Sequence, residues 1–117
     1  MPTVVIKHRF TGAALYSHET TDERQASGLA LRDALECALR SGSDLRYSDL
    51  SGSDLSGSDL SGPNLRGSNL RGSDLRWSNL SGSDLSGSNL SGAWINYDPQ
   101  IPGWKLGDDG CLWRSEN

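Results

Sequence analysis

Residues 48–80 read SDLSGSDLSGSDLSGPNLRGSNLRGSDLRWSNL and carry a leucine at every fifth position without a slip. A small residue stands two positions before each leucine, and Asp or Asn stands directly before it. Glycine follows two positions later, except where Tyr47, Trp77 and Tyr97 replace it. The full register consists of Leu45, Leu50, Leu55, Leu60, Leu65, Leu70, Leu75, Leu80, Leu85, Leu90 and Ile95.

A chain rich in Ser, Gly and Asp normally buries too little apolar surface to fold, so disorder is the first alternative. The strict leucine register argues against it. A period of five fits neither a single helix nor a single strand. It fits a coil of four five-residue sides with leucine pointing inward, whose stacked turns form a parallel ladder spaced about 4.8 Å apart. The sequence therefore predicts a solenoid of a little under three turns over residues 41–97, with these leucines and Ile95 as its structural core.

The units S-D-L-S-G and S-N-L-R-G resemble the A-[DN]-L-x-x unit of the pentapeptide repeat family, with Ser in place of the usual Ala. The resemblance covers residues 43–97 and implies a right-handed quadrilateral parallel β-helix. The stretch VVIKHRFTGAALYSHE, followed by a short helix, is similar to the start of small phage and prophage members. Some members of the family engage type II topoisomerases by mimicking duplex DNA, so the resemblance implies a protein partner that handles nucleic acid.

A turn of twenty residues also explains how acidic residues are distributed along the repeat. Carboxylates one ladder step apart repel each other, and alternation with Asn avoids that repulsion. Only Asp54 over Asp74 brings two carboxylates together, and Arg76 is close enough to offset them. The other predicted stacks are Asp44–Asn64–Asp84, Asp49–Asn69–Asn89 and Asp59–Asn79.

Charge is layered along the predicted solenoid, and each layer is a candidate partner-binding surface. The first turn forms an acidic rim of Asp44, Asp49, Asp54 and Asp59, whose charge only Arg46 partly offsets. The second turn forms an Arg–aromatic belt, in which Trp77 is expected to stack on Tyr97 with Trp94 nearby; its arginines are Arg66, Arg71 and Arg76. The alternative is that the aromatic residues only cover the last turn and the arginines only solvate the outside.

Open ends of a β-helix invite edge-to-edge association, so both flanking segments are expected to be caps. Residues 1–40 predict a hairpin around Thr11-Gly12, with its register open, and a helix over roughly 28–40 capped by Ser27. Residues 98–117 predict a hairpin of 103–106 and 111–114 around a four-residue loop. In its simplest register Leu106 opposes Cys111 and Trp104 opposes Trp113. Caps at opposite ends would hold Cys37 and Cys111 too far apart for a disulfide.

Composition excludes several classes of protein. The chain of 117 residues has a net charge of −4 and a pI near 5, which argues against a general nucleic-acid binder. It contains no apolar run of membrane-spanning length and no signal-peptide pattern, so a cytoplasmic location is expected, in the host if the chain is phage-encoded. His8 and His18 could approach each other across the hairpin, but no third ligand or nucleophile accompanies them. We expect no cofactor, no metal and no enzymatic activity.

The sequence thus predicts a non-enzymatic protein-binding protein, most simply an inhibitor or protector of a topoisomerase or a host defence nuclease that mimics DNA. The alternative is a rigid structural or assembly module that binds through its Arg–aromatic belt or its ends, where a homodimer would also form. A third hypothesis takes the regularly spaced outward serines as a hydroxyl surface for ice or glycan. These serines are Ser51, Ser56, Ser61, Ser81, Ser86 and Ser91.

Overall fold

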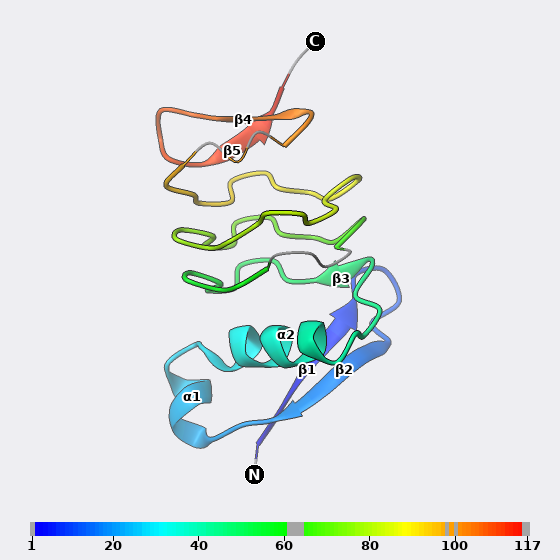
Figure 1. Ribbon diagram of the computed structural model, residues 1–117. Helices are drawn as coiled ribbons and strands as arrows, with labels where there is room; N and C mark the ends of the chain where they lie inside the picture. Colours follow the sequence, from blue (N-terminus) through cyan, green and yellow to red (C-terminus); the bar gives the residue numbers. More distant parts are fainter. Residues whose placement is uncertain (1, 61–64, 98, 100, 116–117) are drawn as a thin grey trace.

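The computed structural model describes residues 2–60, 65–97, 99 and 101–115. The molecule is elongated, measuring 46 × 25 × 23 Å. Figure 1 shows its three parts in chain order: a hairpin and two helices at the N-terminal end, stacked coils in the middle, and a second hairpin at the C-terminal end. Within the described residues, no helix is long and apolar enough to cross a membrane.

The N-terminal hairpin pairs β1 (Thr3–His8) with β2 (Ala14–Glu19) in antiparallel fashion, which confirms the hairpin predicted around Thr11-Gly12. Ile6 faces Tyr16 and is fully buried. The register shifts between Ile6 and Lys7, which pair with Tyr16 and Ala14, so that Leu15 of β2 is left as a bulge. The C-terminal end of β1 pairs antiparallel with β3 (Ser48–Asp49), so the hairpin is joined to the first coil by backbone hydrogen bonding.

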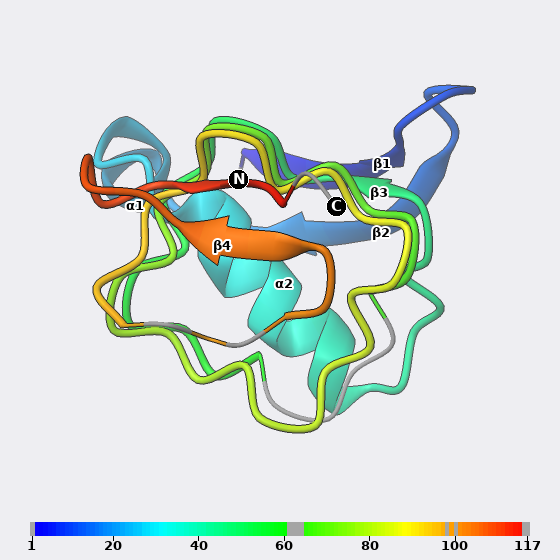
Figure 2. The ribbon, with the colours of Figure 1, turned by 90° about the horizontal axis from the view of Figure 1, so that it is seen from above.

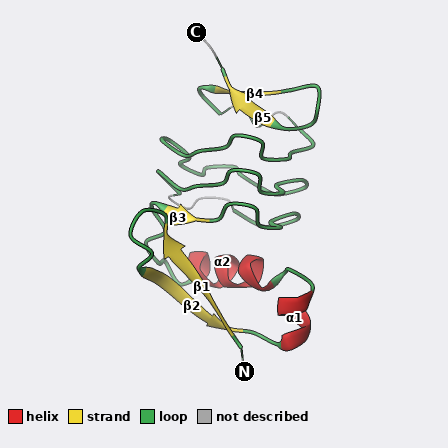
Figure 3. Ribbon diagram, turned by 180° about the vertical axis from the view of Figure 1, so that it is seen from behind, coloured by secondary structure: helices red, strands yellow, loops and turns green. Residues whose placement is uncertain are grey.

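The helix predicted over roughly 28–40 is α2 (Ala30–Arg40), and a short helix that the sequence did not predict, α1 (Asp22–Ala26), precedes it; both are drawn in red in Figure 3. Ser27 does not cap α2 at its start; it ends α1. The better N-cap lies upstream, where the Thr21 hydroxyl accepts a hydrogen bond from the Arg24 backbone N–H. Gly28, at a φ of 80°, then turns the chain between the two helices.

Helix α2 buries one face beneath the first coil, as its apolar spacing predicts. Ala34, Leu35 and Ala38 are fully buried, while Leu31 and Leu39 pack against the same core and are partly exposed. Viewed from above in Figure 2, α2 runs beneath the area that the coils enclose. The leucine core of the repeat therefore continues into α2 without a break.

The described residues between 45 and 95 follow a β-helix-like path with a repeat of twenty residues, as the sequence predicts. Parallel bridges join Asp49 to Asn69 and Asn69 to Asn89, as well as Asp54 to Asp74 and Asp59 to Asn79. The chain traces of successive coils overlie one another in Figure 2. The repeat leucines point to the interior and are buried, apart from Leu80, which is partly exposed. The predicted contact of Asp44 with Asn64 lies outside the described residues.

In most of the described repeats the Asx residue forms a local turn that Asp and Asn serve equally well. The side chain of Asp49 accepts a hydrogen bond from the Ser51 backbone N–H at 3.2 Å, and Asn69 accepts one from Arg71 at 3.1 Å. Such Asx turns need one acceptor oxygen, which both residue types supply. The glycine that comes next, Gly52 for example at a φ of 65°, provides the left-handed conformation that turns the corner.

The inward serines bond mainly to the backbone. The hydroxyl of Ser73 donates to the Leu70 carbonyl at 2.7 Å, and that of Ser88 donates to the Leu65 carbonyl at 3.1 Å. These bonds satisfy hydroxyl groups that would otherwise be buried without partners. In the described part of the chain, only the hydroxyls of Ser48 and Ser58 are buried with no partner.

The C-terminal hairpin pairs β4 (Trp104–Leu106) with β5 (Leu112–Arg114). Its predicted register is wrong by one residue, since Leu106 faces Leu112 and Trp104 faces Arg114. Cys111 belongs to the connection instead, where its carbonyl accepts from the Gly107 N–H at 2.8 Å and the residue bridges to Trp94. The Trp104–Trp113 pair therefore does not form. The Arg114 guanidinium lies 5.2 Å from the centre of the Trp104 ring in its place.

Strand β5 continues the ladder of the last coil in antiparallel fashion. The Leu112 N–H donates to the Ala93 carbonyl at 2.8 Å, and the Gly92 N–H donates to the Leu112 carbonyl at 2.9 Å. Leu112 itself is buried against the end of the leucine core. Cys37 lies in α2 and Cys111 beside β5, at opposite ends of the molecule, and both cysteines are free.

Candidate protein-binding surfaces

Trp77 and Tyr47 are the two exposed aromatic residues of the described chain with a left-handed backbone, and Trp77 is the more exposed of the two. It occupies a glycine position of the repeat and adopts a φ of 62°, in the left-handed region that bulky side chains rarely enter. Its side chain is 76% exposed, so burial of the ring does not compensate for the strain. The backbone N–H of Trp77 donates to the Asn96 side chain at 2.7 Å, which holds the conformation. Strain of this kind is concentrated at functional sites.

Arg76 lies between a carboxylate and an aromatic ring. Its Nη2 donates to Asp74 Oδ2 at 2.7 Å, and its guanidinium carbon is 4.5 Å from the centre of the Trp94 ring. The hydrogen bonds from Arg76 lower the pKa of the Asp74 carboxyl group below its ordinary value. Because Trp94 bridges to Asp74, this contact depends on the stacking of residues twenty apart. The arginine is thereby held against the ring with its charge still exposed to solvent.

Tyr97 completes this surface through a bond to the coil below. Its hydroxyl donates to the Ser78 carbonyl at 2.6 Å. In the regular ladder that carbonyl would accept from residue 99, as the Ser58 carbonyl accepts from Asn79, but Pro99 has no N–H to donate. The predicted ring stacking of Trp77 on Tyr97 is not among the aromatic contacts of the described residues. We call Arg76, Trp77, Trp94 and Tyr97 the Arg–Trp surface.

The other two arginines of the predicted belt lie apart from this surface. Arg66 and Arg71 occupy the preceding corners of the same coil, and their carbonyls accept from Tyr47 and Gly52 in the coil below. The structure thus brings Arg76, Trp77 and Tyr97 together, adds Trp94, and distributes Arg66 and Arg71 around the coil.

The four aspartates of the acidic rim likewise lie on successive corners of one coil. Asp44 pairs with Arg46 at 2.8 Å, and the hydrogen bonds from Arg46 lower the pKa of the Asp44 carboxyl group to about 2. Asp49 and Asp54 accept hydrogen bonds from serine hydroxyl groups at 2.7 and 2.6 Å. Asp59 bridges to Asn79 through the backbone.

The family-model comparison identifies the repeat. The model for pentapeptide repeats matches residues 41–62 and 60–93, with eight copies of the unit. The chain is a pentapeptide repeat protein. No curated protein and no solved structure matches it significantly. Pentapeptide repeat proteins are generally structural or protein-interaction modules without enzymatic activity. The similarity to phage members remains a prediction.

This pentapeptide repeat protein has a second aromatic cluster, which the sequence did not predict. The Tyr47 ring stacks on His8 at 5.8 Å and lies 6.5 Å from Phe10, which is 72% exposed. Arg9 lies over the Phe10 ring and donates to the Gly67 carbonyl at 2.9 Å. The sequence does mark Tyr47 as unusual, because it occupies a glycine position of the repeat, as Trp77 does. Nothing in the sequence indicates that the hairpin tip docks beside it.

The histidines do not meet across the hairpin, contrary to the prediction. His18 faces Val4, whereas His8 lies at the far end of β1 and its Nδ1 accepts from the backbone N–H groups of Phe10 and Thr11. Among the described residues, no three His, Cys, Asp or Glu side chains are grouped so that they could hold a metal ion. Burial raises the pKa of the Cys111 thiol above its ordinary value, so its thiolate is disfavoured.

Proposed function

We propose that this pentapeptide repeat protein is a non-enzymatic binding module that contacts a partner protein through the Arg–Trp surface. The scaffold is a right-handed quadrilateral β-helix, capped by the N-terminal hairpin and α2 at one end and by the C-terminal hairpin at the other. The observation that carries the proposal is the conformation of Trp77, which is strained and highly exposed beside the Arg76–Trp94 contact.

The chemistry of the surface supports a protein partner. Trp, Tyr and Arg are the residues that most often dominate the binding energy of protein interfaces. Trp94 is 46% exposed and Tyr97 37%, so Arg76 and the three rings together offer apolar area with one charged group. Ladder hydrogen bonds hold the backbones of Arg76 and Trp94, and the Asn96 side chain holds that of Trp77, so little backbone entropy is lost when a partner binds.

For the partner we propose a nucleic-acid-handling protein, such as a topoisomerase or a host defence nuclease, that the chain inhibits or protects. The acidic rim supports this choice of partner. Its carboxylates lie on successive corners of one rigid coil, and serine hydroxyls hold those of Asp49 and Asp54 in fixed orientations. Fixed carboxylates on a rigid coil resemble phosphates and would compete for a basic DNA-binding cleft.

A pull-down from host lysate with three baits tests both elements. The baits are the wild-type chain, a variant with Asp44, Asp49, Asp54 and Asp59 changed to Asn, and a variant with Arg66, Arg71 and Arg76 changed to Ser. The Asn variant keeps the fold because Asn already fills equivalent positions at Asn69 and Asn79.

Binding through the Arg–Trp surface predicts that the Ser variant loses the partner that the wild type recovers. Loss in the Asn variant alone, with a slower association rate that depends on salt, would support DNA mimicry instead. Equal recovery by all three baits would contradict both.

A further inference from the structure

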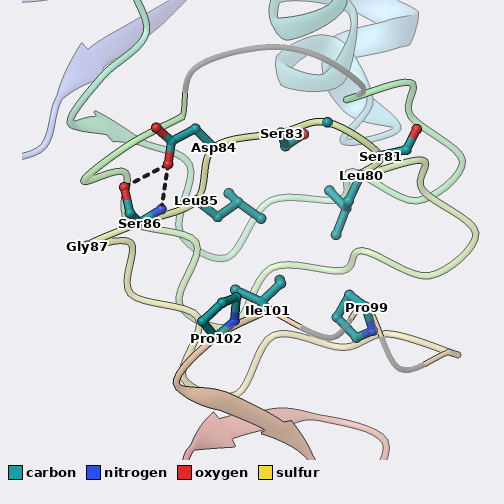
Figure 4. Close-up of a pocket in the computed structure, with 11 residues that line it drawn as sticks. Leu80, Ser81, Ser83, Asp84, Leu85, Ser86, Gly87, Pro99, Ile101 and Pro102 are labelled. Atoms are coloured by element: carbon teal, nitrogen blue, oxygen red, sulfur yellow. Dashed lines mark hydrogen bonds between the residues drawn. The ribbon is translucent and has the colours of Figure 1, made fainter.

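A cleft of about 530 Å³ opens between the last coil and the segment that leads to the C-terminal hairpin. Figure 4 shows Leu80 and Leu85 on one side and Pro99, Ile101 and Pro102 on the other. The lining of the cleft is partly polar, since it also includes serines and Asp84. It lies where another regular pentad would continue the ladder over residues 80–87.

The backbone next to this cleft is an unpaired ladder edge. One coil below, the Leu65 N–H donates to the Asp84 carbonyl at 3.0 Å and the Gly67 N–H donates to the Ser86 carbonyl at 2.9 Å. Leu85 and Gly87 occupy the equivalent positions one coil higher. In the described part of the molecule no acceptor is found for their N–H groups. Farther along the chain this edge is paired, where the Gly92 N–H donates to the Leu112 carbonyl of β5 and the Ile95 N–H donates to the Gly110 carbonyl.

We infer that this cleft accepts an extended peptide segment of a partner protein, which pairs with residues 84–87 as an added strand. Two carbonyls of the segment, two residues apart, would accept from the N–H groups of Leu85 and Gly87. Adding a strand to an open sheet edge is a general mode of peptide recognition, in which the backbone supplies affinity and side-chain pockets supply specificity. This site is separate from the Arg–Trp surface and does not depend on it.

The lining specifies the occupant. The residue that lies over Leu85 must be aliphatic to cover it, and Ile101 faces it from the other side of the cleft. The residue two positions before it must be small, because Ser83 occupies that place in the coil below. Asp84 is the charged side chain of the lining, and hydrogen bonds from Ser86 lower the pKa of its carboxyl group, so it is ionised at neutral pH. The segment is therefore neutral or basic, with the pattern small–any–aliphatic.

An eight-residue peptide, Gly-Ser-Ala-Asn-Leu-Lys-Gly-Ser with blocked ends, tests the inference by amide hydrogen exchange of the full chain. At saturating peptide, exchange at Leu85 and Gly87 should slow by about tenfold or more, while Leu65 and Gly67 stay unchanged. The control peptide has glycine in place of the leucine and should give no protection. The I101W variant places a larger ring in the cleft and should weaken protection. R76S and W77G should bind the peptide as the wild type does.

Four results would overturn the inference. The first is that Leu85 and Gly87 exchange as slowly as Leu65 and Gly67 in the free chain, because the edge would then already be paired. The second is equal protection by the glycine control. The third is protection that rises with protein concentration alone, which would make a second copy of this chain the occupant. Loss of peptide binding in R76S or W77G would assign the peptide to the Arg–Trp surface.

Discussion

At the level of single residues, the repeat works because each position has one local task. Leucine fills the interior, the Asx side chain accepts the N–H two residues later, and glycine turns the corner. The substitution of Ser for the family's usual Ala puts a hydroxyl group inside at most repeats. The backbone accommodates these hydroxyls at Ser73 and Ser88, but those of Ser48 and Ser58 have no partner among the described residues.

This difference predicts opposite effects of the same substitution. S58A should stabilise the protein by about 1 kcal/mol, because it removes a buried hydroxyl group that has no hydrogen-bond partner. S73A should be neutral or destabilising, since its hydroxyl donates to the Leu70 carbonyl. Urea unfolding followed by circular dichroism measures both. A lower midpoint for S58A than for S73A would show that Ser58 has a partner in solution.

The Asp44–Arg46 pair predicts a pH dependence with a definite sign. The folded-state pKa of Asp44 is about 2, below its ordinary value of 3.8. The pair therefore contributes stability above about pH 4 that is lost as the pH falls toward 2. Both side chains are mostly exposed, so the contribution is small and weakens in salt. An NMR titration should give a midpoint near 2, which rises in R46S; an unchanged midpoint in R46S would exclude the pair as its cause.

At the level of elements, periodicity alone predicts the coil, but it does not predict the contacts that the flanking segments make with the coils. The twenty-residue turn was predictable because side-chain register alone sets it. Helix α1 was not predicted: Thr21 caps its start, and Ser27 ends it instead of capping α2. The hairpin register slipped by one residue because Cys111 is held by Trp94 of the last coil, a contact that the hairpin sequence does not contain.

Strand β5 predicts the behaviour of a truncated chain. Deletion of residues 98–117 removes the partners of Gly92 and Ala93 and uncovers the end of the leucine core beneath Leu112. Exposed ladder edges pair with other chains, so the truncated protein should form oligomers or aggregates. Size-exclusion chromatography with light scattering measures this. W113A, which changes a half-exposed side chain of β5, should remain monomeric. A monomeric truncated chain of unchanged stability would show that the tail is not a cap.

At the level of the whole molecule, stacking brings residues together that are distant in the sequence and builds surfaces from them. Arg76 meets Trp94 because Trp94 stacks on Asp74, twenty residues earlier, and Arg76 pairs with Asp74, so the sequence predicted Trp94 near the belt. The bond from Tyr97 to the Ser78 carbonyl could not be predicted, because it replaces a ladder bond that Pro99 cannot make. The cluster of Phe10 and Tyr47 required the docked hairpin, whose tip projects beyond the coils in Figure 2.

If the strained Trp77 serves to bind the partner, W77G should weaken partner binding without lowering the stability of the fold. Glycine adopts a φ of 62° without strain, and the wild-type ring is largely exposed, so the unfolding midpoint should be unchanged or higher. The measurement is the Kd of W77G for the partner recovered by pull-down, determined by titration calorimetry beside the wild type. We predict a Kd at least about tenfold weaker, as expected when an aromatic anchor is lost. A W77G chain that is equally stable and binds the partner as tightly as the wild type would show that Trp77 is not a binding residue.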